Sequence, residues 1–295
     1  MQPRYTEIQE KKRVALYSVL AAIVITSLKV LAGWFTGSLG ILSEALHSAL
    51  DLMAAAITLM TVRIASKPAD SQHHFGHGKF ENLSALIQTL LLLVTCGWIV
   101  MEAINRLRVG HTEIEVNVWS FAVILFSVGV DYNRSRTLGR VARKYNSQAL
   151  EADALHFSTD IWSSVVVLLG LGLSAFGFFL ADAVAALAVA GIVVYVSLKL
   201  GRRAVDALLD RTPSGMTEII HNTLEAIPGI RQYHDLKVRA SGPEVFIEMN
   251  IHLDGNMTLE EAHAITEEIE SRLHSLIPRC RVHVHQEPHD GSRGA

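Results

Sequence analysis

The stretch VALYSVLAAIVITSLKVLAGWF, residues 14–35, carries a single charge, at Lys29, and otherwise consists of apolar, small and hydroxyl side chains. A helix needs about 20 such residues to cross the hydrocarbon core of a membrane, which is about 30 Å thick. Five similar stretches follow this one along the chain. The sequence therefore predicts a membrane protein with six transmembrane helices, over residues 14–35, 39–62, 83–104, 116–133, 152–176 and 179–200.

The composition divides the chain into two parts. Over its 295 residues the protein is 50% hydrophobic and 19% charged, with a mean hydropathy of +0.30. Residues 1–210 contain 18 lysines and arginines and 16 aspartates and glutamates, a net charge of +2, whereas residues 211–295 contain 8 and 13, a net charge of −5. No apolar run after residue 210 is long enough to cross a membrane. We expect a cytoplasmic segment at 1–13, a transmembrane domain at 14–210, a cytoplasmic domain at 211–290 and a tail at 291–295.

Lysine and arginine predict the orientation in the membrane, because they concentrate in cytoplasmic connections. The amino-terminal segment, the even-numbered connections and the segment after the last span hold 15 of them, against 2 in the odd-numbered connections. The fourth connection, expected over residues 134–144, contributes 5 of the 15. Both termini should therefore lie in the cytoplasm, and we expect the protein in a bacterial-type inner (plasma) membrane.

The patterns after residue 210 are those of a small α+β domain. A helix is expected over 216–226, and strands over 234–240, 245–253 and 280–286, where apolar and polar side chains alternate. Ser241-Gly242-Pro243 should form a hairpin turn, and Thr258 with Glu261 forms a capping box that opens a helix to about Leu276. The order αββαβ predicts an open sheet with helices on one face. Its core is small, so dimerisation would help to stabilise it.

Several classes of protein are excluded by composition. Only Cys96 and Cys280 are present, which argues against a disulfide-stapled scaffold or a CxxC zinc ribbon. The sequence has neither a basic tail nor an RNA-binding motif, so no nucleic-acid partner is expected. It also lacks a nucleophile motif beside the ionisable residues of the apolar stretches, and we expect no enzymatic activity.

Two of the predicted spans carry the same pair of residues, His47 with Asp51 and His156 with Asp160. Side chains at i and i+4 stand on one face of a helix, about 6 Å apart along the axis. Ionisable side chains within a membrane are costly and by default indicate a functional site. Two helices that each offer an imidazole nitrogen and a carboxylate oxygen can enclose one ion in a tetrahedral N2O2 shell, which suits Zn2+. A packed, hydrogen-bonded set of side chains is the alternative.

The sequence resembles the cation diffusion facilitator family in four segments: GS at 37–38, SEALHSALD at 43–51, PADSQHHFGHGK at 68–79 and ALHFSTD at 154–160. The resemblance covers essentially the whole chain. It implies a homodimeric exporter of divalent transition metals that exchanges metal for protons, with its transport site at His47, Asp51, His156 and Asp160. Some members carry Asp at the position of His47 and accept more metals, so the resemblance implies a preference for zinc.

The resemblance also assigns roles in the loop between the second and third spans. It implies a second metal site of Asp70, His73 and His77 where the loop meets the cytoplasmic domain. The alternative is a polar loop with solvated histidines. Lys79 and Asp210 match positions that form a charge interlock between the third and sixth spans at the dimer centre. Two snorkelling charges at the membrane surface are the alternative.

In the cytoplasmic domain, His283 and His285 share one face of the last strand, and Asn250 and His252 share the polar face of the middle strand. Asn250 occupies a position where some relatives have histidine. Either the metal cluster of this domain is incomplete, or His252 substitutes. The resemblance implies regulatory metal ligands at His234, His263, His285 and Glu287, with His252 and His283 as near neighbours.

The sequence thus predicts a secondary active transporter that exports Zn2+ from the cytoplasm in exchange for protons, with Zn2+ also as the regulatory ligand. Its expected partners are a second copy of the chain, the lipid bilayer and protons. One alternative is the same fold with Fe2+, Cd2+, Co2+ or Mn2+ as the physiological ion. Another is a membrane metal sensor or assembly partner that transports nothing.

Overall fold

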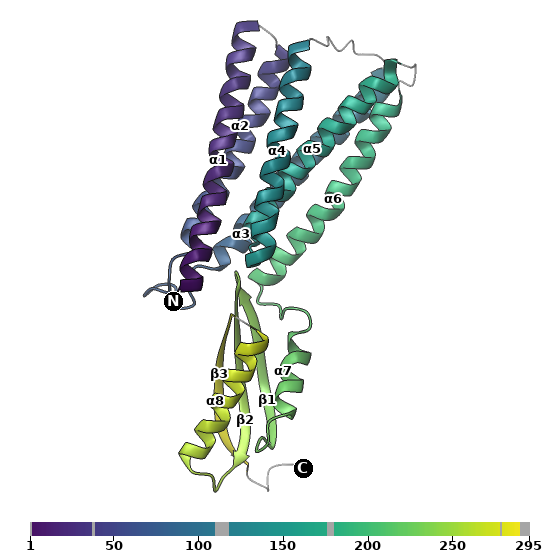
Figure 1. Ribbon diagram of the computed structural model, residues 1–295. Helices are drawn as coiled ribbons and strands as arrows, with labels where there is room; N and C mark the ends of the chain where they lie inside the picture. The colour runs from purple at the N-terminus through teal and green to yellow at the C-terminus, as the bar shows by residue number, and fades with distance from the viewer. Residues whose placement is uncertain (1, 37–38, 110–117, 176–179, 278, 290–295) are drawn as a thin grey trace. The chain divides into compact units, whose positions relative to one another are not determined.

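The computed structural model describes residues 2–36, 39–109, 118–175, 180–277 and 279–289. Within these ranges, the side chains at 2–4, 36, 39–44, 99, 102–103, 106–109, 118–124, 167–175 and 180–186 are outside the description. The chain contacts define two units (Figure 1). One comprises residues 1–68 and 80–205, and the other comprises residues 69–79 and 206–295. The loop that carries Asp70, His73 and His77 thus groups with the carboxyl-terminal part of the chain.

The first unit is built from six long helices. They are α1 (Gln2–Thr36), α2 (Leu39–Ala65), α3 (Lys79–Val109), α4 (Val118–Tyr145), α5 (Gln148–Ala175) and α6 (Leu180–Leu208). Helix α1 packs on α2, α4 packs on α5, and further contacts join α1 to α4 and α2 to α5. Small residues permit close packing. For example, a Cβ added at Gly201 of α6 would lie 3.0 Å from a Thr89 side-chain carbon of α3.

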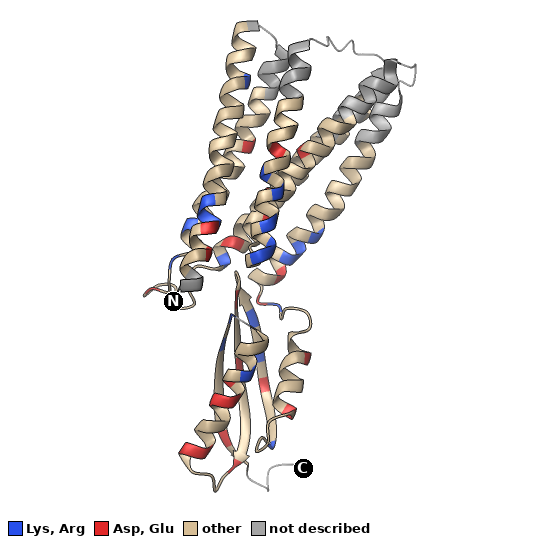
Figure 2. Cartoon of the chain, viewed as in Figure 1, with Lys and Arg blue, Asp and Glu red and all other residues tan. Residues whose placement is uncertain are grey.

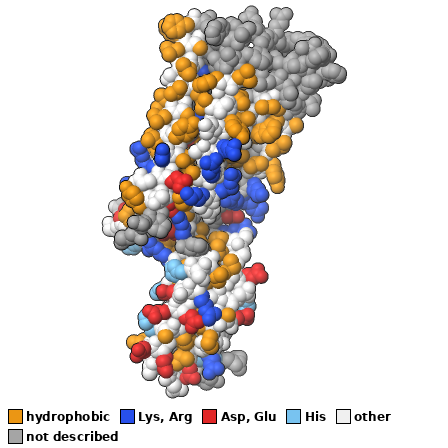
Figure 3. Space-filling view, viewed as in Figure 1, with side chains coloured by type: hydrophobic (Ala, Val, Ile, Leu, Met, Phe, Trp, Pro, Cys, Tyr) orange, Lys and Arg blue, Asp and Glu red, His pale blue; other side chains and the backbone are white. Residues whose placement is uncertain are grey.

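The surface of these helices is apolar. Trp34 is 79% exposed and Trp98 is 74% exposed, and Figure 3 shows hydrophobic side chains spread over the helical unit. Lipid tails can cover such a surface, whereas water cannot do so without a large cost. By length and composition, three described segments can cross a membrane: Tyr5–Phe35, Ala45–Ala65 and Lys79–Trp98. The prediction of a helical transmembrane region is confirmed. Parts of the three later predicted spans lie outside the described side chains.

The lysines and arginines described in the helical unit gather mostly toward one end of its helices (Figure 2). The predicted connection over residues 134–144 is wrong, because α4 continues to Tyr145 and α5 begins at Gln148. Arginine, lysine, leucine and alanine are strong helix formers, and this segment contains no proline to end the helix. Arg134 is only 2% exposed, so it lies inside the bundle rather than in an aqueous connection.

The carboxyl-terminal domain confirms the predicted α+β order. It consists of α7 (Met216–Glu225), β1 (Gln232–Ser241), β2 (Glu244–Asp254), α8 (Leu259–Leu276) and β3 (Cys280–His289). The sheet order is β1-β2-β3, with β2 antiparallel to β1 and parallel to β3. Both helices contribute to one core with the alternating apolar side chains of β2. The predicted capping box is also confirmed, since Thr258 Oγ1 accepts from the Glu261 backbone N–H and Glu261 accepts from the Thr258 backbone N–H.

The loop 69–79 packs against the hairpin that joins β1 to β2. A Cβ at Gly78 would lie 2.3 Å from the Ser241 carbonyl oxygen, so only glycine allows this approach. Phe75 meets Phe246 edge to face, with ring centroids 5.2 Å apart, and the Arg239 guanidinium lies 4.0 Å from the Phe75 centroid. These contacts hold the loop in a defined position within the second unit.

Candidate metal centres

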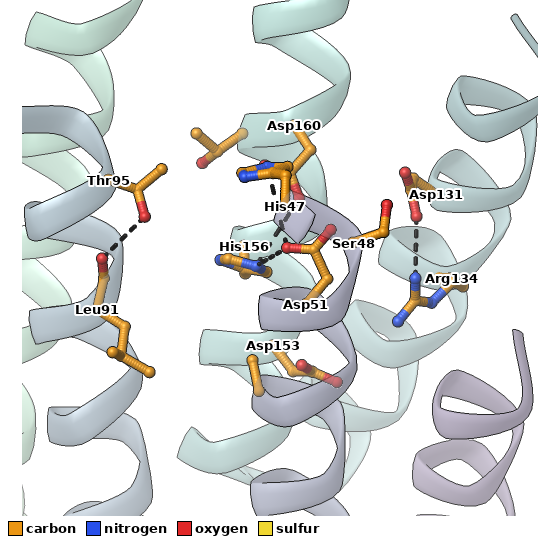
Figure 4. A network of polar contacts seen from close by, with 12 residues as sticks. His47, Ser48, Asp51, Leu91, Thr95, Asp131, Arg134, Asp153, His156 and Asp160 are labelled. Atoms are coloured by element: carbon orange, nitrogen blue, oxygen red, sulfur yellow. Dashed lines mark hydrogen bonds and ion pairs between the residues drawn. The ribbon is translucent and has the colours of Figure 1, made fainter. Parts of the chain in front are cut away.

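Helices α2 and α5 bring the four predicted membrane ligands together. The pair His47 and Asp51 comes from α2, and the pair His156 and Asp160 comes from α5. Each pair occupies one face of its helix, as the four-residue spacing predicts. Figure 4 shows the four side chains pointing toward one another across the contact between the two helices.

The ligand atoms of His47, Asp51 and Asp160 lie within 4.8 Å of one another, and His156 faces both carboxylates. His156 Nε2 lies 2.9 Å from Asp51 Oδ1 and 3.9 Å from Asp160 Oδ2. His47 Nε2 lies 3.7 Å from Asp160 Oδ1 and 4.0 Å from Asp51 Oδ1. Zinc bonds of about 2.0–2.2 Å in a tetrahedron separate the ligand atoms by about 3.3 Å. Small movements would therefore convert this arrangement into a complete N2O2 shell.

Burial differs among the four side chains. Those of His156, Asp51 and Asp160 are 10%, 13% and 16% exposed, whereas the His47 side chain is 39% exposed. Next to His47, Lys29 Nζ of α1 donates to Ser48 Oγ at 2.9 Å, and Thr26 Oγ1 donates to the Ser48 carbonyl oxygen. These bonds tie α1 to the α2 segment that carries His47. Lys29, at 6% exposure, therefore acts between helices.

The loop brings Asp70, His73 and His77 into a second cluster. Asp70 Oδ1 accepts from the backbone N–H groups of Gln72, at 2.9 Å, and His73, at 2.7 Å. These hydrogen bonds favour the carboxylate and lower the pKa of Asp70. Its two oxygens lie 3.3 Å from His73 Nδ1 and 3.4 Å from His77 Nε2. The result is an ionised carboxylate facing two imidazoles, a donor set suited to a transition metal.

The predicted charge pair also forms. Lys79 Nζ lies 2.9 Å from Asp210 Oδ1. The other oxygen of this carboxylate, Oδ2, lies 3.7 Å from Nη1 of Arg239. Asp210 has a positive φ of 59°, a conformation in which aspartate is tolerated better than most residues. Arg239 thus contacts both Asp210 and Phe75 of the loop 69–79.

A third cluster lies on the sheet face opposite the helices, with Glu287 at its centre. The register pairs His252 with Glu287, Asn250 with His285, and His234 with Asn250. Glu287 Oε2 lies 3.5 Å from His252 Nε2 and 3.8 Å from His234 Nε2, and Oε1 lies 3.7 Å from His285 Nε2. Asn250 Nδ2 donates to Glu287 Oε1 at 3.1 Å. Asn250 therefore orients the carboxylate, and His234, His252 and Glu287 are spaced so that they could hold a metal ion.

Two of the predicted ligands do not join this cluster within one chain. His263 lies on α8, where its Nε2 is 3.6 Å from Glu267 Oε1, whereas the cluster lies on the face of the sheet away from α8. His283 is exposed on β3 and pairs in register with Glu248. His289 is exposed, as expected of a surface residue, and its ring centroid lies 5.9 Å from that of His252. The two-residue spacing from Glu287 is the signal that could have indicated it.

Comparison with known proteins identifies the class. Residues 15–209 match the family model of the cation efflux transmembrane domain, and residues 213–289 match that of the cation efflux protein cytoplasmic domain. The chain therefore belongs to the cation diffusion facilitator family, and it is a cation efflux transporter rather than an enzyme.

Two relatives that match nearly the whole chain agree with this assignment. The cation-efflux pump FieF of Yersinia enterocolitica is 33% identical over 291 residues, which cover 98% of this chain and 95% of that protein. FieF of Cronobacter sakazakii is 35% identical over 284 residues, covering 94% and 92%. The metal-bound carboxyl-terminal domain of the CzcD transporter from Thermotoga maritima is 32% identical, covers 25% of this chain and 86% of that one, and has a TM-score of 0.24.

Proposed function

We propose that this transporter exports Zn2+ from the cytoplasm in exchange for protons, with His47, Asp51, His156 and Asp160 as the transport site. The observation that carries the proposal is that each of two imidazole nitrogens, from α2 and α5, lies 2.9–4.0 Å from both carboxylates of the set. Two nitrogen and two oxygen ligands in a tetrahedral arrangement suit zinc better than larger ions that prefer more oxygen ligands.

Protons compete with the metal for the same atoms. His156 Nε2 and Asp51 Oδ1 lie at hydrogen-bonding distance, 2.9 Å, so the proton that they share must leave before a metal binds both atoms. Imidazoles in general titrate near neutral pH, which lets protons displace zinc after the site has opened to the other side of the membrane. Each ligand of the site then holds either metal or proton, and exchange follows.

The two clusters of the second unit are proposed to be regulatory. The loop site comprises Asp70, His73 and His77, and the sheet site comprises His234, His252, His285 and Glu287, with His283 beside it. His263 would serve as a ligand only where a second chain brings it to the metal. We propose a homodimer in which Lys79 and Asp210 form the charge interlock at its centre.

We also propose the placement in the cell. Both termini lie in the cytoplasm, and the protein resides in the inner membrane as a multi-pass protein, with domain boundaries at residues 13, 210 and 290. The gathering of lysine and arginine toward one end of the helices supports this orientation.

Transport assays in reconstituted vesicles test the proposal. Vesicles loaded with a metal-sensitive dye are challenged with Zn2+, Fe2+, Cd2+, Co2+ and Mn2+ in separate experiments, each with and without a pH gradient. We expect Zn2+ to be taken up fastest and the gradient to accelerate uptake. A different preferred ion would replace zinc on the same site, and no flux for any ion would favour a sensor.

A further inference from the structure

A buried arginine lies beside the proposed transport site but is not one of its four ligands. Arg134 of α4 is 2% exposed, and its guanidinium makes three contacts of different kinds. One NH2 group lies 3.0 Å from Asp131 Oδ1, and the other donates to Ser18 Oγ of α1 at 3.2 Å. The face of the guanidinium lies 3.5 Å from the ring centroid of Phe157 on α5. Figure 4 shows Arg134 and Asp131 close to the four ligands.

Two sets of contacts connect Arg134 to the proposed ligand His156, one through Phe157 and one through Ser18 and Asp153. Phe157 follows His156 in the chain and meets its imidazole edge to face, with centroids 5.5 Å apart. Ser18 Oγ, which accepts from Arg134, donates to Asp153 Oδ2 at 3.3 Å, and Asp153 precedes His156 by less than one helical turn. Arg134 thus holds α5 on both sides of His156, from a different helix.

A long, flexible lysine could not make the same set of contacts. The planar guanidinium offers two hydrogen-bonding groups in a fixed fork and a flat face for stacking, whereas an ammonium group is a compact point charge. Phe157 and Asp153 are both 0% exposed, so neither has space to adopt another position without moving α5. The rotation of α5 decides whether His156 Nε2 faces Asp51.

We infer that Arg134 is a positioning residue for metal binding: by stacking on Phe157 and by its hydrogen bond to Ser18, it fixes the orientation of α5 that turns His156 toward Asp51. This inference rests on the proposed function of the four-ligand site. Groups that orient a metal ligand without touching the metal usually change its affinity about 10- to 100-fold. The role predicts weaker zinc binding, rather than a slower turnover of the saturated transporter.

The test uses the full chain in reconstituted vesicles and separates the half-saturating zinc concentration from the maximal rate. Arg134→Lys keeps the charge and removes the stack. Phe157→Leu keeps every charge and most of the volume, and removes the aromatic face between Arg134 and His156. The matched controls are Arg136→Lys, at an exposed position of the same helix, and Phe126→Leu, whose side chain is 53% exposed. Asp160→Ala is included to test the transport site itself.

Both test variants should raise the half-saturating zinc concentration by about tenfold or more, with a maximal rate close to that of the parent. Both controls should behave as the parent does. An unchanged half-saturating concentration in Phe157→Leu overturns the inference, even if Arg134→Lys fails to fold, and so does a fall in maximal rate alone. Parental transport by Asp160→Ala would instead overturn the proposed function.

Discussion

His156 Nε2 lies 2.9 Å from Asp51 Oδ1, and this contact joins α5 to α2 beside the group of His47, Asp51 and Asp160. The hydrogen bond satisfies two polar groups that would otherwise be buried without a partner. It also holds the ligand atoms near the positions that a metal needs, so binding requires the loss of a proton and little movement. In the proposed exchange, this contact corresponds to the proton-bound site.

Removal of one anionic ligand should abolish transport. Asp51→Ala or Asp160→Ala leaves three ligands and one negative charge fewer, and we expect the affinity for zinc to fall by about 100-fold or more. Zinc flux into vesicles measures the effect, with gel filtration to check that the folded assembly persists. Asp206→Ala, which breaks only a surface ion pair with Arg211, is the matched control. More than half of the parental rate in either ligand variant would contradict the site assignment.

The choice of metal should depend on His47. In His47→Asp, a carboxylate oxygen that can bind in a bidentate manner replaces a nitrogen, and the preference for tetrahedral N2O2 coordination relaxes. We expect the ratio of zinc to cadmium transport rates to fall, measured in the same vesicle preparation. An unchanged ratio would show that His47 does not set the selectivity.

Zinc should stabilise the carboxyl-terminal domain through Glu287. A ligand that binds only the folded form adds about 2.7 kcal/mol at a concentration 100 times its Kd. The domain has a net charge of −5 over residues 211–295, so bound cations also reduce repulsion between two copies. We expect hydrogen exchange in β2 and β3 of the full chain to slow when zinc replaces chelator.

Glu287→Gln should remove most of that protection, because Glu287 lies between His234, His252 and His285. His274→Gln serves as the control, since His274 lies on α8 and contacts the Glu270 carbonyl oxygen. Equal exchange with zinc and with chelator in the parent protein would remove the sensor role and leave the domain a structural one.

The capping box of α8 should contribute measurably to local stability. Replacement of Thr258 by Ala removes the acceptor for the Glu261 N–H, and loss of such a cap usually costs about 1 kcal/mol. Faster hydrogen exchange over the first turn of α8 is the expected result. Thr266→Ala, inside the same helix, is a control that leaves the cap intact.

The same cap predicts a dependence on pH. Hydrogen bonds from the backbone N–H and hydroxyl of Thr258 lower the pKa of Glu261. A carboxyl whose pKa is lower in the folded state stabilises the fold above its unfolded pKa, about 4.3 for glutamate, and this contribution is lost as pH falls through the folded value. Glu261→Gln should flatten this acid-side change in the exchange of α8. An identical pH profile in the variant and the parent would contradict it.

The sequence predicts the site best where a local rule is sufficient. The four-residue spacing of His47 with Asp51 places the two on one face of a helix, and alternation places His283 and His285 on one face of a strand. Neither rule says which elements become neighbours. Helix α8 connects β2 to β3 in the chain, and this crossover lets β3 run parallel to β2. The parallel register then pairs Glu287 with His252.

The prediction from sequence is wrong at the end of α4, where a cluster of basic residues indicates a connection and the helix continues to Tyr145. Arg134 was counted with a water-exposed connection because five basic residues follow one another closely in that segment. In the structure it is buried by Asp131, Ser18 and Phe157, and only Asp131 is near it in the chain. A charge whose partners come from three helices cannot be recognised from spacing alone.

The simultaneous measurement of zinc and proton movement in one vesicle preparation tests the central claim most directly. The vesicles carry a zinc-sensitive dye and a pH-sensitive dye, and zinc is added outside. The account predicts that zinc uptake is accompanied by proton movement in the opposite direction, and that both signals vanish together in Asp160→Ala. Zinc uptake without proton movement, or both signals at the parental level in Asp160→Ala, would contradict it.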